Sequence, residues 1–326
     1  MIHIGDFAIS LDRLERGASM DFISHAHTDH IYAAKRSSCV IASKPTVDLM
    51  KSAYGINAKP AMQEHTDKIS AKLLNSGHMM GSRQLAVVSP EGERIVYTGD
   101  FQMQKSRVAE YIEIPQADTV IIDSTYPFPK VRFDDRCETE TAIQKWTTAK
   151  LERGSVLFGA YAMGKSQELI SILNEIGIAP LVSPKIANIS ATYSGNGYKL
   201  DYVPLGSGAE AFVGLGHSFV SITEKPLADT ASRLASLIGA KVFTGVATGF
   251  AKSFRFDTDV QFALSDHADF VQSVDYINAT GAKTVLTYGK GATAFAANLC
   301  IAGFNAKPFP STGAGSAADY PHAVFM

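Results

Sequence analysis

Three histidines and an aspartate crowd into six residues near the start of the chain. The segment 25–30 reads HAHTDH and directly follows the apolar run 20–23. Neutral imidazole and carboxylate groups suit zinc, at bond lengths of about 2.0–2.2 Å. In an extended stretch alternate side chains share a face, so His25, His27 and Asp29 are expected to point one way and His30 another. A polar turn with chance histidines is the competing interpretation, which four ligand types in six residues disfavour.

Two further ligand candidates each follow a glycine. His78 comes after Gly77, and Asp100 comes after Gly99. Glycine permits backbone conformations that other residues resist, which suits a ligand presented by a tight loop. Taken alone, His78 is more often a surface histidine and Asp100 a strand-end cap, so their value lies in the ordered set that they complete.

The elements that must position these residues are short strands that end at polar side chains. We predict strands over 72–74, 84–89, 94–97, 119–122, 260–264 and 284–287, with a hairpin turn over 90–93. Strand ends that share a sheet edge gather distant residues into one site. Between them, helical stretches over 138–151 and 166–176 alternate with a strand over 155–158, which predicts a parallel α/β unit inserted into the first domain.

Composition sets outer limits. The chain has 326 residues, 46% of them hydrophobic and 19% charged, which is typical of one large or two ordinary globular domains. No apolar run approaches the ~20 residues of a membrane span, and the start lacks the pattern of a signal peptide. Three scattered cysteines predict neither disulfides nor a cysteine zinc site, so we expect a cytoplasmic setting. The net charge of −2 gives no global sign of nucleic-acid binding, and a phosphate-binding surface must therefore be local.

The ordered set H-x-H-x-D-H, then His, then Asp resembles the metallo-β-lactamase superfamily. The resemblance implies a zinc enzyme with an αββα core. His25, His27 and His78 would hold a first zinc ion, Asp29 and His30 a second, and Asp100 would bridge the two. Asp12 sits where the superfamily often has an early supporting aspartate.

Further motifs narrow the resemblance to the β-CASP nuclease branch, whose members include the cleavage and polyadenylation nucleases, ribonuclease J, Artemis-type nucleases and ligase-associated exonucleases. These motifs are DSTY at 123–126, GKSQE at 164–168 and SDHADF at 265–270. The resemblance implies a core of 1–123 and 264–326, with an α/β cap domain over 124–263. It also implies catalytic roles for Asp29, Asp123 and His267.

One family position departs from the pattern. The branch commonly has a histidine after the last strand that completes the second zinc site, and Tyr288 stands there in this chain. A neutral tyrosine is a poor zinc ligand, since its pKa lies near 10. We therefore expect two zinc sites, with the second one partially occupied.

The segment 159–166 reads GAYAMGKS and formally satisfies the nucleotide-binding pattern G-x-x-x-x-G-K-S. The same segment also matches the β-CASP run, which argues against a P-loop. An exposed helix N-terminus favours anions, so Lys165 and Ser166, with Ser265, are candidates for contacts to a substrate phosphate.

These observations predict a zinc-dependent hydrolase that cleaves phosphodiester bonds in RNA or single-stranded DNA, like an RNA 3'-end processing exonuclease. One alternative is a small-molecule metallo-hydrolase on the same core, and another is a catalytically impaired homologue that only binds nucleic acid. The sequence gives no sign of a membrane partner and is silent on oligomeric state. It does not choose RNA over DNA.

Overall fold

The computed structural model describes residues 1–4, 7–35, 37, 39–60, 70–208, 218–224 and 227–310. The chain divides into two compact units. Unit 1 comprises Met1–Arg132 and the described residues from His267 on, and unit 2 comprises Phe133–Asp266. The predicted insertion over 124–263 overlaps most of unit 2, and its assignment as a cap domain stays a prediction. The last part of the predicted core, 311–326, lies outside the described residues.

Unit 1 contains two main sheets and helices on their outer sides. Its strands are β1 (Ile2–Ile4), β2 (Phe7–Leu11), β3 (Met20–Phe22), β4 (Cys39–Val40), β5 (Lys59–Pro60), β6 (Ala71–Asn75), β7 (Arg83–Val88), β8 (Arg94–Tyr97), β9 (Thr119–Asp123), β16 (Thr284–Tyr288) and β17 (Ala306–Pro308). Its helical elements are η1 (Ala33–Lys35), α1 (Lys44–Tyr54), α8 (Phe270–Thr280) and α9 (Ala292–Ile301). One sheet has the order β1-β2-β3 and the other β17-β16-β9-β8-β7-β6.

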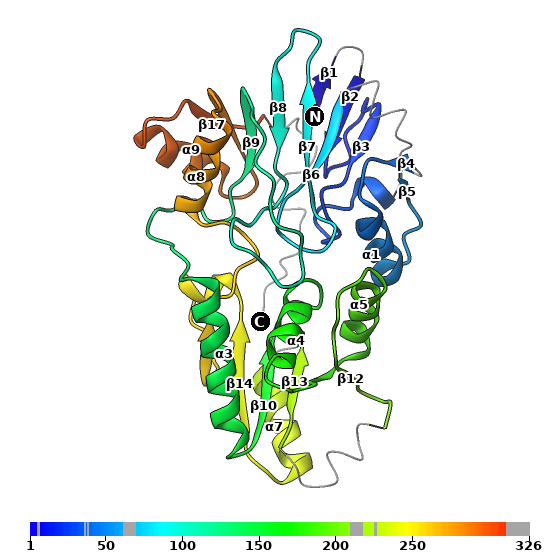
Figure 1. Ribbon diagram of the computed structural model, residues 1–326, viewed down its shortest axis with the longest axis vertical. Coiled ribbons are helices and arrows are strands. Elements are labelled where there is room, and N and C mark those ends of the chain that lie inside the picture. The colour runs from blue at the N-terminus through cyan, green and yellow to red at the C-terminus, as the bar shows by residue number, and fades with distance from the viewer. Residues whose placement is uncertain are drawn as a thin grey trace. The chain divides into compact units, whose positions relative to one another are not determined.

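The two sheets of unit 1 pack face to face. Ile9 and Phe22 of the smaller sheet share one buried cluster with Leu85 and Tyr97 of the larger one. The opposite face of the larger sheet packs against α8 and α9 in a second cluster. Figure 1 shows α1 on the far side of the smaller sheet, so the layers run α, β, β, α. This arrangement confirms the predicted α/β sandwich.

Unit 2 is a single parallel sheet covered by helices. Its strands are β10 (Ser155–Gly159), β11 (Leu181–Val182), β12 (Val203–Pro204), β13 (Val220–Thr223), β14 (Val242–Ala247) and β15 (Val260–Phe262), in the order β12-β11-β13-β10-β14-β15. Its helical elements are α3 (Arg136–Leu151), α4 (Lys165–Asn174), α5 (Pro184–Gly195), α7 (Leu227–Ile238) and η2 (Gly249–Lys252). All five strand pairs are parallel, as the alternating pattern predicts.

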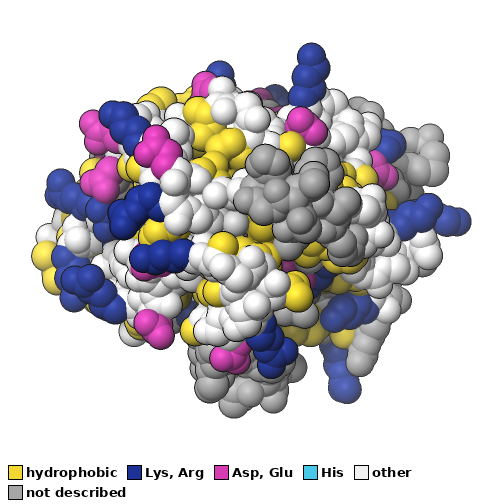
Figure 2. All heavy atoms as spheres, turned by 90° about the horizontal axis from the view of Figure 1, so that it is seen from below, with side chains coloured by type: hydrophobic (Ala, Val, Ile, Leu, Met, Phe, Trp, Pro, Cys, Tyr) yellow, Lys and Arg dark blue, Asp and Glu magenta, His cyan; other side chains and the backbone are white. Residues whose placement is uncertain are grey.

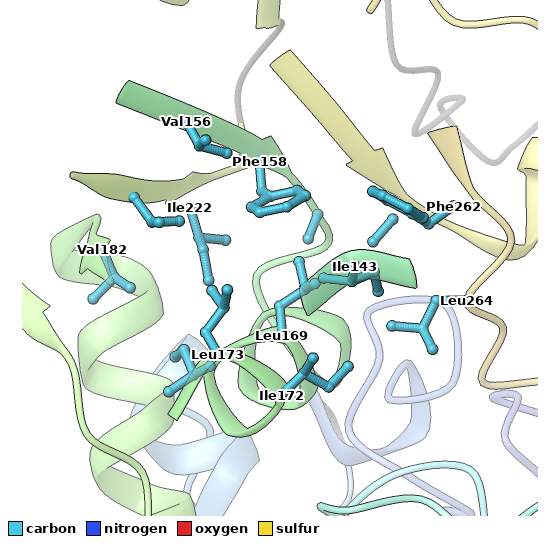
Figure 3. Close-up of a cluster of buried hydrophobic side chains, with 14 of the residues drawn as sticks. Ile143, Val156, Phe158, Leu169, Ile172, Leu173, Val182, Ile222, Phe262 and Leu264 are labelled. Carbon is cyan, nitrogen blue, oxygen red and sulfur yellow. The ribbon is translucent and has the colours of Figure 1, made fainter. Parts of the chain in front are cut away.

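The central strand of unit 2, β10, is buried on both faces. Val156 and Phe158 face the helices α3, α4 and α5 through a cluster that includes Leu169 (Figure 3). On the other face, a Cβ atom at Gly159 would lie 2.9 Å from the Leu227 side chain of α7. Side chains alternate across a strand, so this run of apolar residues is what a strand between two helical layers requires.

The polar surface of the molecule is mixed in sign. Figure 2 shows one face, on which Lys and Arg side chains lie among Asp, Glu and apolar ones, as the net charge of −2 suggests. Among the described residues, no helix combines the length and the apolarity that a bilayer span requires.

Candidate metal centre

The histidine-rich segment forms a loop at the end of β3. Its backbone is extended only to Phe22, and a turn over 28–30 follows, in which the His30 amide donates to the His27 carbonyl at 3.0 Å. The expectation that His30 points away from its neighbours is therefore wrong. The turn brings the His30 ring back to 4.1 Å from the His25 ring, centroid to centroid.

The side chains predicted as ligands converge on the Asp100 carboxylate. Its Oδ2 atom lies 3.5 Å from the Nε2 atoms of both His25 and His30, and 3.7 Å from Nε2 of His78. His27 Nδ1 lies 3.0 Å from His25 Nε2 and 3.2 Å from His78 Nε2. Three imidazoles thus turn a nitrogen atom toward one carboxylate oxygen, and the fourth, His27, lies against two of them.

Spacing and chemistry both fit a metal ion. Potential ligand atoms of His25, His27, His78 and Asp100 all lie within 4.8 Å of one another. Two ligands of a tetrahedral zinc ion are separated by roughly 3.3 Å, given bonds near 2.0 Å, and the observed separations scatter around that value. The described residues therefore include a group that could hold a metal ion. Asp29 lies at its edge, with Oδ2 3.8 Å from His30 Nε2 and a side chain that is 65% exposed.

Asp12 supports this centre through hydrogen bonds. Its carboxylate accepts hydrogen bonds from the Ser24 amide at 2.6 Å, the Ser24 hydroxyl at 2.7 Å, and the Tyr97 hydroxyl at 2.8 Å. It also lies 2.8 Å from His30 Nδ1, and the Ser24 hydroxyl in turn lies 2.9 Å from His25 Nδ1. Asp12 thus fixes the rings of two candidate ligands, directly for His30 and through Ser24 for His25, as outer partners of metal ligands do.

The two glycines before the ligands are required by close backbone approaches. At Gly99, whose φ is 53°, a Cβ atom would lie 2.5 Å from the Ser24 Cβ atom. At Gly77, whose φ is 79°, a Cβ atom would lie 2.3 Å from the Gln102 carbonyl oxygen. Both sites therefore confirm that glycine permits the geometry that presents His78 and Asp100.

Burial shifts the proton affinities of the cluster in opposite directions. Burial first, and then the surrounding imidazoles, lower the pKa of His25 well below its usual value. Burial also lowers the pKa of His30, but the Asp100 and Asp12 carboxylates outweigh it and the net pKa is raised. Burial raises the pKa of Asp100 to about 7, against the pull of His30 and His267. Without a metal ion, this site therefore retains protons that a carboxylate and an imidazole would normally have lost near neutral pH.

A second pair of residues borders the cluster. His267 Nδ1 lies 2.9 Å from Asp123 Oδ2, and His267 Nε2 lies 3.8 Å from Asp100 Oδ2. Asp123 ends β9, and its Oδ1 accepts from the amide of Thr125 at 3.0 Å and from its hydroxyl at 2.8 Å. The carboxylate fixes one ring nitrogen of His267, and the other nitrogen faces the candidate ligands.

Comparison of the sequence with known proteins finds several relatives. No family model matches the chain. A "Probable DNA ligase" of Opitutus terrae is 30% identical over 297 residues, which cover 87% of this chain and 28% of that protein. A "Transcription termination factor FttA" of Lokiarchaeum is 36% identical over 111 residues, covering 33% of this chain and 18% of the relative. An "RNase J-like protein" of Methanocaldococcus jannaschii is 29% identical over 182 residues, covering 47% and 42%. The chain thus spans less than half the length of each of these relatives.

The chain belongs to the β-CASP branch of the metallo-β-lactamase superfamily. The candidate metal ligands and the His267–Asp123 pair lie together in unit 1, whereas the GKSQE motif at 164–168 lies in unit 2. His25, His27, His30, His78 and Asp100 converge on one centre, with His267 and Asp123 beside it. The roles of these residues as metal ligands and catalytic groups stay predictions.

Tyr288, where the β-CASP branch commonly has a histidine, ends β16 directly beside Asp123 of β9. Its hydroxyl donates to the Leu11 carbonyl at 3.3 Å, and its ring lies edge-on to Tyr97 at 5.3 Å. The Arg13 guanidinium lies 4.7 Å from the centre of that ring. Tyr288 therefore packs next to the Asp12 region that supports the centre.

The candidates for phosphate contacts lie in unit 2 and are buried. The Lys165 ammonium donates to the Asp266 carboxylate, and the Ser166 hydroxyl donates to the Tyr161 carbonyl at 2.7 Å. The Ser265 carbonyl accepts from Arg136 at 2.8 Å. At the start of α4 the Gly164 amide donates to the Gln167 side chain at 2.7 Å. A phosphate role for Lys165, Ser166 and Ser265 stays a prediction, and for Lys165 it would require the ammonium to leave its carboxylates.

Sequence reasoning missed several residues that hold the centre in place. Ser24 and Tyr97 connect to Asp12, and Gln102 donates to the His267 carbonyl at 2.9 Å. Ser24 is adjacent to the first ligand and Gln102 follows Asp100 by two residues, which is the only local signal that they carry. Their partners are distant in sequence, so periodicity and spacing could not reveal them.

Proposed function

We propose that this protein is a metal-dependent nuclease that hydrolyses phosphodiester bonds of RNA or single-stranded DNA. The observation that carries the proposal is the convergence of three imidazoles on Asp100, with Nε2 of His267, the partner of Asp123, 3.8 Å from the same oxygen. A phosphodiesterase needs a nucleophile, stabilisation of charge at phosphorus and a proton for the leaving oxygen, and this group can meet all three needs.

The metal in the proposal is zinc, at two sites. His25, His27 and His78 would hold the first ion, Asp29 and His30 the second, and Asp100 would bridge them. Bound zinc supplies hydroxide at neutral pH by lowering the pKa of water, and it neutralises charge on a phosphate oxygen. The donor set of imidazoles and carboxylates is the one that zinc prefers.

His267 is proposed as the general acid. When its ring is doubly protonated, the Nδ1 proton stays on the ring in a hydrogen bond to Asp123, and Nε2 donates its proton to the leaving oxygen. Asp123 serves as the positioning group, since its other oxygen is already anchored by Thr125. Asp12, through Ser24 and His30, keeps the ligand rings aligned while substrate binds.

Single-stranded DNA is the better supported substrate of the two. The match that covers 87% of this chain is to a probable DNA ligase, whereas the RNase J-like match covers 47%. A nuclease connected to a ligase would trim ends before they are joined. RNA remains the competing substrate, because the shorter matches include proteins named for RNA cleavage and transcription termination.

The deciding experiment uses end-labelled and internally labelled RNA and single-stranded DNA, with added zinc and with chelator. Zinc-dependent shortening of DNA, abolished by chelator, is the expected result, and product size reveals whether cleavage is from an end or internal. Cleavage of a thioester or lactam with none on either polymer would instead indicate a small-molecule hydrolase. Tight binding of nucleic acid without cleavage, across several divalent metals, would indicate a catalytically impaired homologue.

The second zinc site is tested at Tyr288. Because tyrosine is a poor ligand, we expect the wild-type protein to bind its second zinc ion weakly. Tyr288→His should raise affinity for the second ion in a zinc titration, while affinity for the first stays unchanged. An unchanged titration would mean that residue 288 does not border the second site.

A further inference from the structure

Unit 2 contains a compact cluster of buried charged side chains outside the metal centre. Arg136 lies at the start of α3, Lys165 and Glu168 lie in the first turn of α4, and Asp266 follows β15. Their side chains are at most 12% exposed. Burying charges costs free energy that apolar residues of similar volume would not cost, so such a cluster needs a reason.

The contacts of the cluster are directional. Arg136 forms a two-pronged pair with Glu168, in which Nε lies 2.9 Å from Oε1 and Nη2 donates to Oε2. The Asp266 Oδ1 atom accepts from the Lys165 ammonium and lies 3.5 Å from Arg136 Nη2. Lys165 Nζ is also 3.6 Å from Glu168 Oε2. Each of the two cations therefore lies between the same two carboxylates.

Arg136 keeps its positive charge in this cluster. Burial alone would lower the pKa of Arg136, but the Glu168 carboxylate outweighs it and the net pKa is raised. Two cations and two carboxylates contact one another in this cluster. It therefore resembles a structural ion network rather than an anion-binding site. The pattern at 159–166 that is typical of a phosphate loop is explained by this use of Lys165.

The cluster holds the backbone that leads directly into His267. Arg136 Nη1 donates to the Ser265 carbonyl at 2.8 Å, and the next residue is Asp266, held by Lys165. The chain passes from unit 2 to unit 1 between Asp266 and His267. In unit 1, directly after this boundary, Gln102 donates to the His267 carbonyl, and the Ala268 amide donates to the Phe101 carbonyl at 2.8 Å.

We propose that the buried ion cluster of Arg136, Lys165, Glu168 and Asp266 is a positioning device for His267. It fixes the two residues before the imidazole, as Phe101 and Gln102 fix the imidazole's own backbone. The inference rests on the proposed function only in its catalytic consequence, since the holding of the 265–268 backbone can be measured without any activity. A directional ion cluster can define the entry of this segment more sharply than an apolar contact of equal size, because its hydrogen bonds constrain orientation.

The test compares Asp266→Asn with Asp134→Asn. Both aspartates pair with a lysine of unit 2, but Asp134 lies 2.8 Å from Lys252 at the surface and is 60% exposed. Hydrogen exchange of a peptide covering 263–270 should be faster in Asp266→Asn and unchanged in Asp134→Asn. For cleavage, kcat should fall by about 10²-fold in Asp266→Asn alone, the size expected when a catalytic group moves by about 1 Å. KM and bound zinc should stay the same.

Two further variants separate positioning from stability. Lys165→Met removes the donor to Asp266 and should behave like Asp266→Asn. Arg136→Met combined with Glu168→Met removes both charges of a buried ion pair, so neither charge of that pair remains without the other, and thermal stability should be preserved. Because the Ser265 carbonyl then loses its donor, kcat should remain low in that double variant.

The proposal is overturned if the variants lower the melting temperature while exchange at 263–270 and kcat per folded molecule match the Asp134→Asn control. Loss of zinc from Asp266→Asn would also overturn it, since the cluster would then act on the metal centre as a whole. If the wild-type protein cleaves no nucleic acid, the proposed function fails, but the exchange comparison still decides whether the cluster holds this segment.

Discussion

The two units both bury ionisable side chains, but they balance them differently. In unit 2 the cations Arg136 and Lys165 meet the carboxylates Glu168 and Asp266 at hydrogen-bonding distance. In unit 1 several imidazoles face Asp100, and the pKa of His25 is lowered well below its usual value by burial and by the other imidazoles. A cluster whose positive and negative side chains pair off needs no ligand. A cluster rich in imidazoles is stabilised by a metal cation, which neutral ring nitrogen atoms can coordinate.

The same comparison separates two motifs that, in the sequence alone, both resemble binding sites. The histidine-rich loop and the G-x-x-x-x-G-K-S pattern both predict a binding site. In the folded chain the first presents its donor atoms to a common point, and the second directs its lysine into an ion pair. A motif therefore indicates a binding site only when folding brings its donor atoms to a common point.

The largest expected effect comes from removing an imidazole of the unbalanced cluster. His78→Ala should abolish zinc retention and reduce cleavage to background, because a catalytic zinc site ordinarily has three protein ligands and the first site would keep only two of its imidazoles. Metal content after dialysis and initial rates measure both effects. His3→Ala, which changes an exposed histidine of β1, is the control and should behave as wild type. Full zinc content in His78→Ala would break the comparison between the units.

The next largest effect is expected at His267, which borders the cluster without belonging to the first zinc site. His267→Ala should lower kcat by about 10²- to 10⁴-fold, as loss of a general acid does. Bound zinc should be almost unchanged, as measured by elemental analysis. If zinc is lost instead, His267 is a ligand and the boundary of the metal centre must be redrawn.

A smaller effect is expected at Asp12, which supports the cluster without touching the metal. Asp12→Asn keeps the side-chain shape, and asparagine tolerates the positive φ of 58° found here. Loss of the carboxylate should weaken zinc binding by about 10- to 100-fold, the usual cost of removing an outer partner of a ligand. Competition with a fluorescent chelator measures this. Asp48→Asn, in an exposed pair with Lys44, is the control and should leave the affinity unchanged.

The smallest expected effect is a pH dependence of metal uptake. In the metal-free protein burial raises the pKa of Asp100 to about 7, so below pH 7 this carboxylate carries a proton that the metal must displace. His30, whose net pKa is also raised, acts in the same direction. Affinity should therefore fall by up to about tenfold per displaced proton for each pH unit below 7. Calorimetry at pH 6 and pH 8, in two buffers of different ionisation enthalpy, should find more protons released at pH 6; equal release would contradict the assignment.

The sequence predicted the strands, the helices and the candidate ligands better than the residues that hold those ligands in place. The strands over 84–89 and 94–97 and the helix over 138–151 appear as β7, β8 and α3, because their apolar spacing records burial directly. The ligand types within 25–30 are likewise visible in one short segment. The turn at His30 was missed because it depends on a local amide-to-carbonyl bond that an alternating pattern cannot encode.

Apart from Asp12, which the resemblance indicates, the supports of the site could not be predicted, for a physical reason. Asp12 meets Tyr97 and Gln102 meets His267 only after the sheets have packed, so no local pattern links these residues. Lys165 is predicted to contact phosphate because exposed amides at a helix start favour anions. No local pattern reveals that its ammonium donates to Asp266, far along the chain.

The first turn of α4 bears on whether the reaction requires a nucleoside triphosphate. The Gly164 amide is taken by Gln167, the Ser166 amide donates to Tyr161, and the adjacent lysine is committed to Asp266. A nucleoside triphosphate would have to displace all three interactions to dock there. We therefore expect cleavage to proceed without ATP. The favourable hydrolysis of the substrate's phosphodiester bonds would be its only source of free energy.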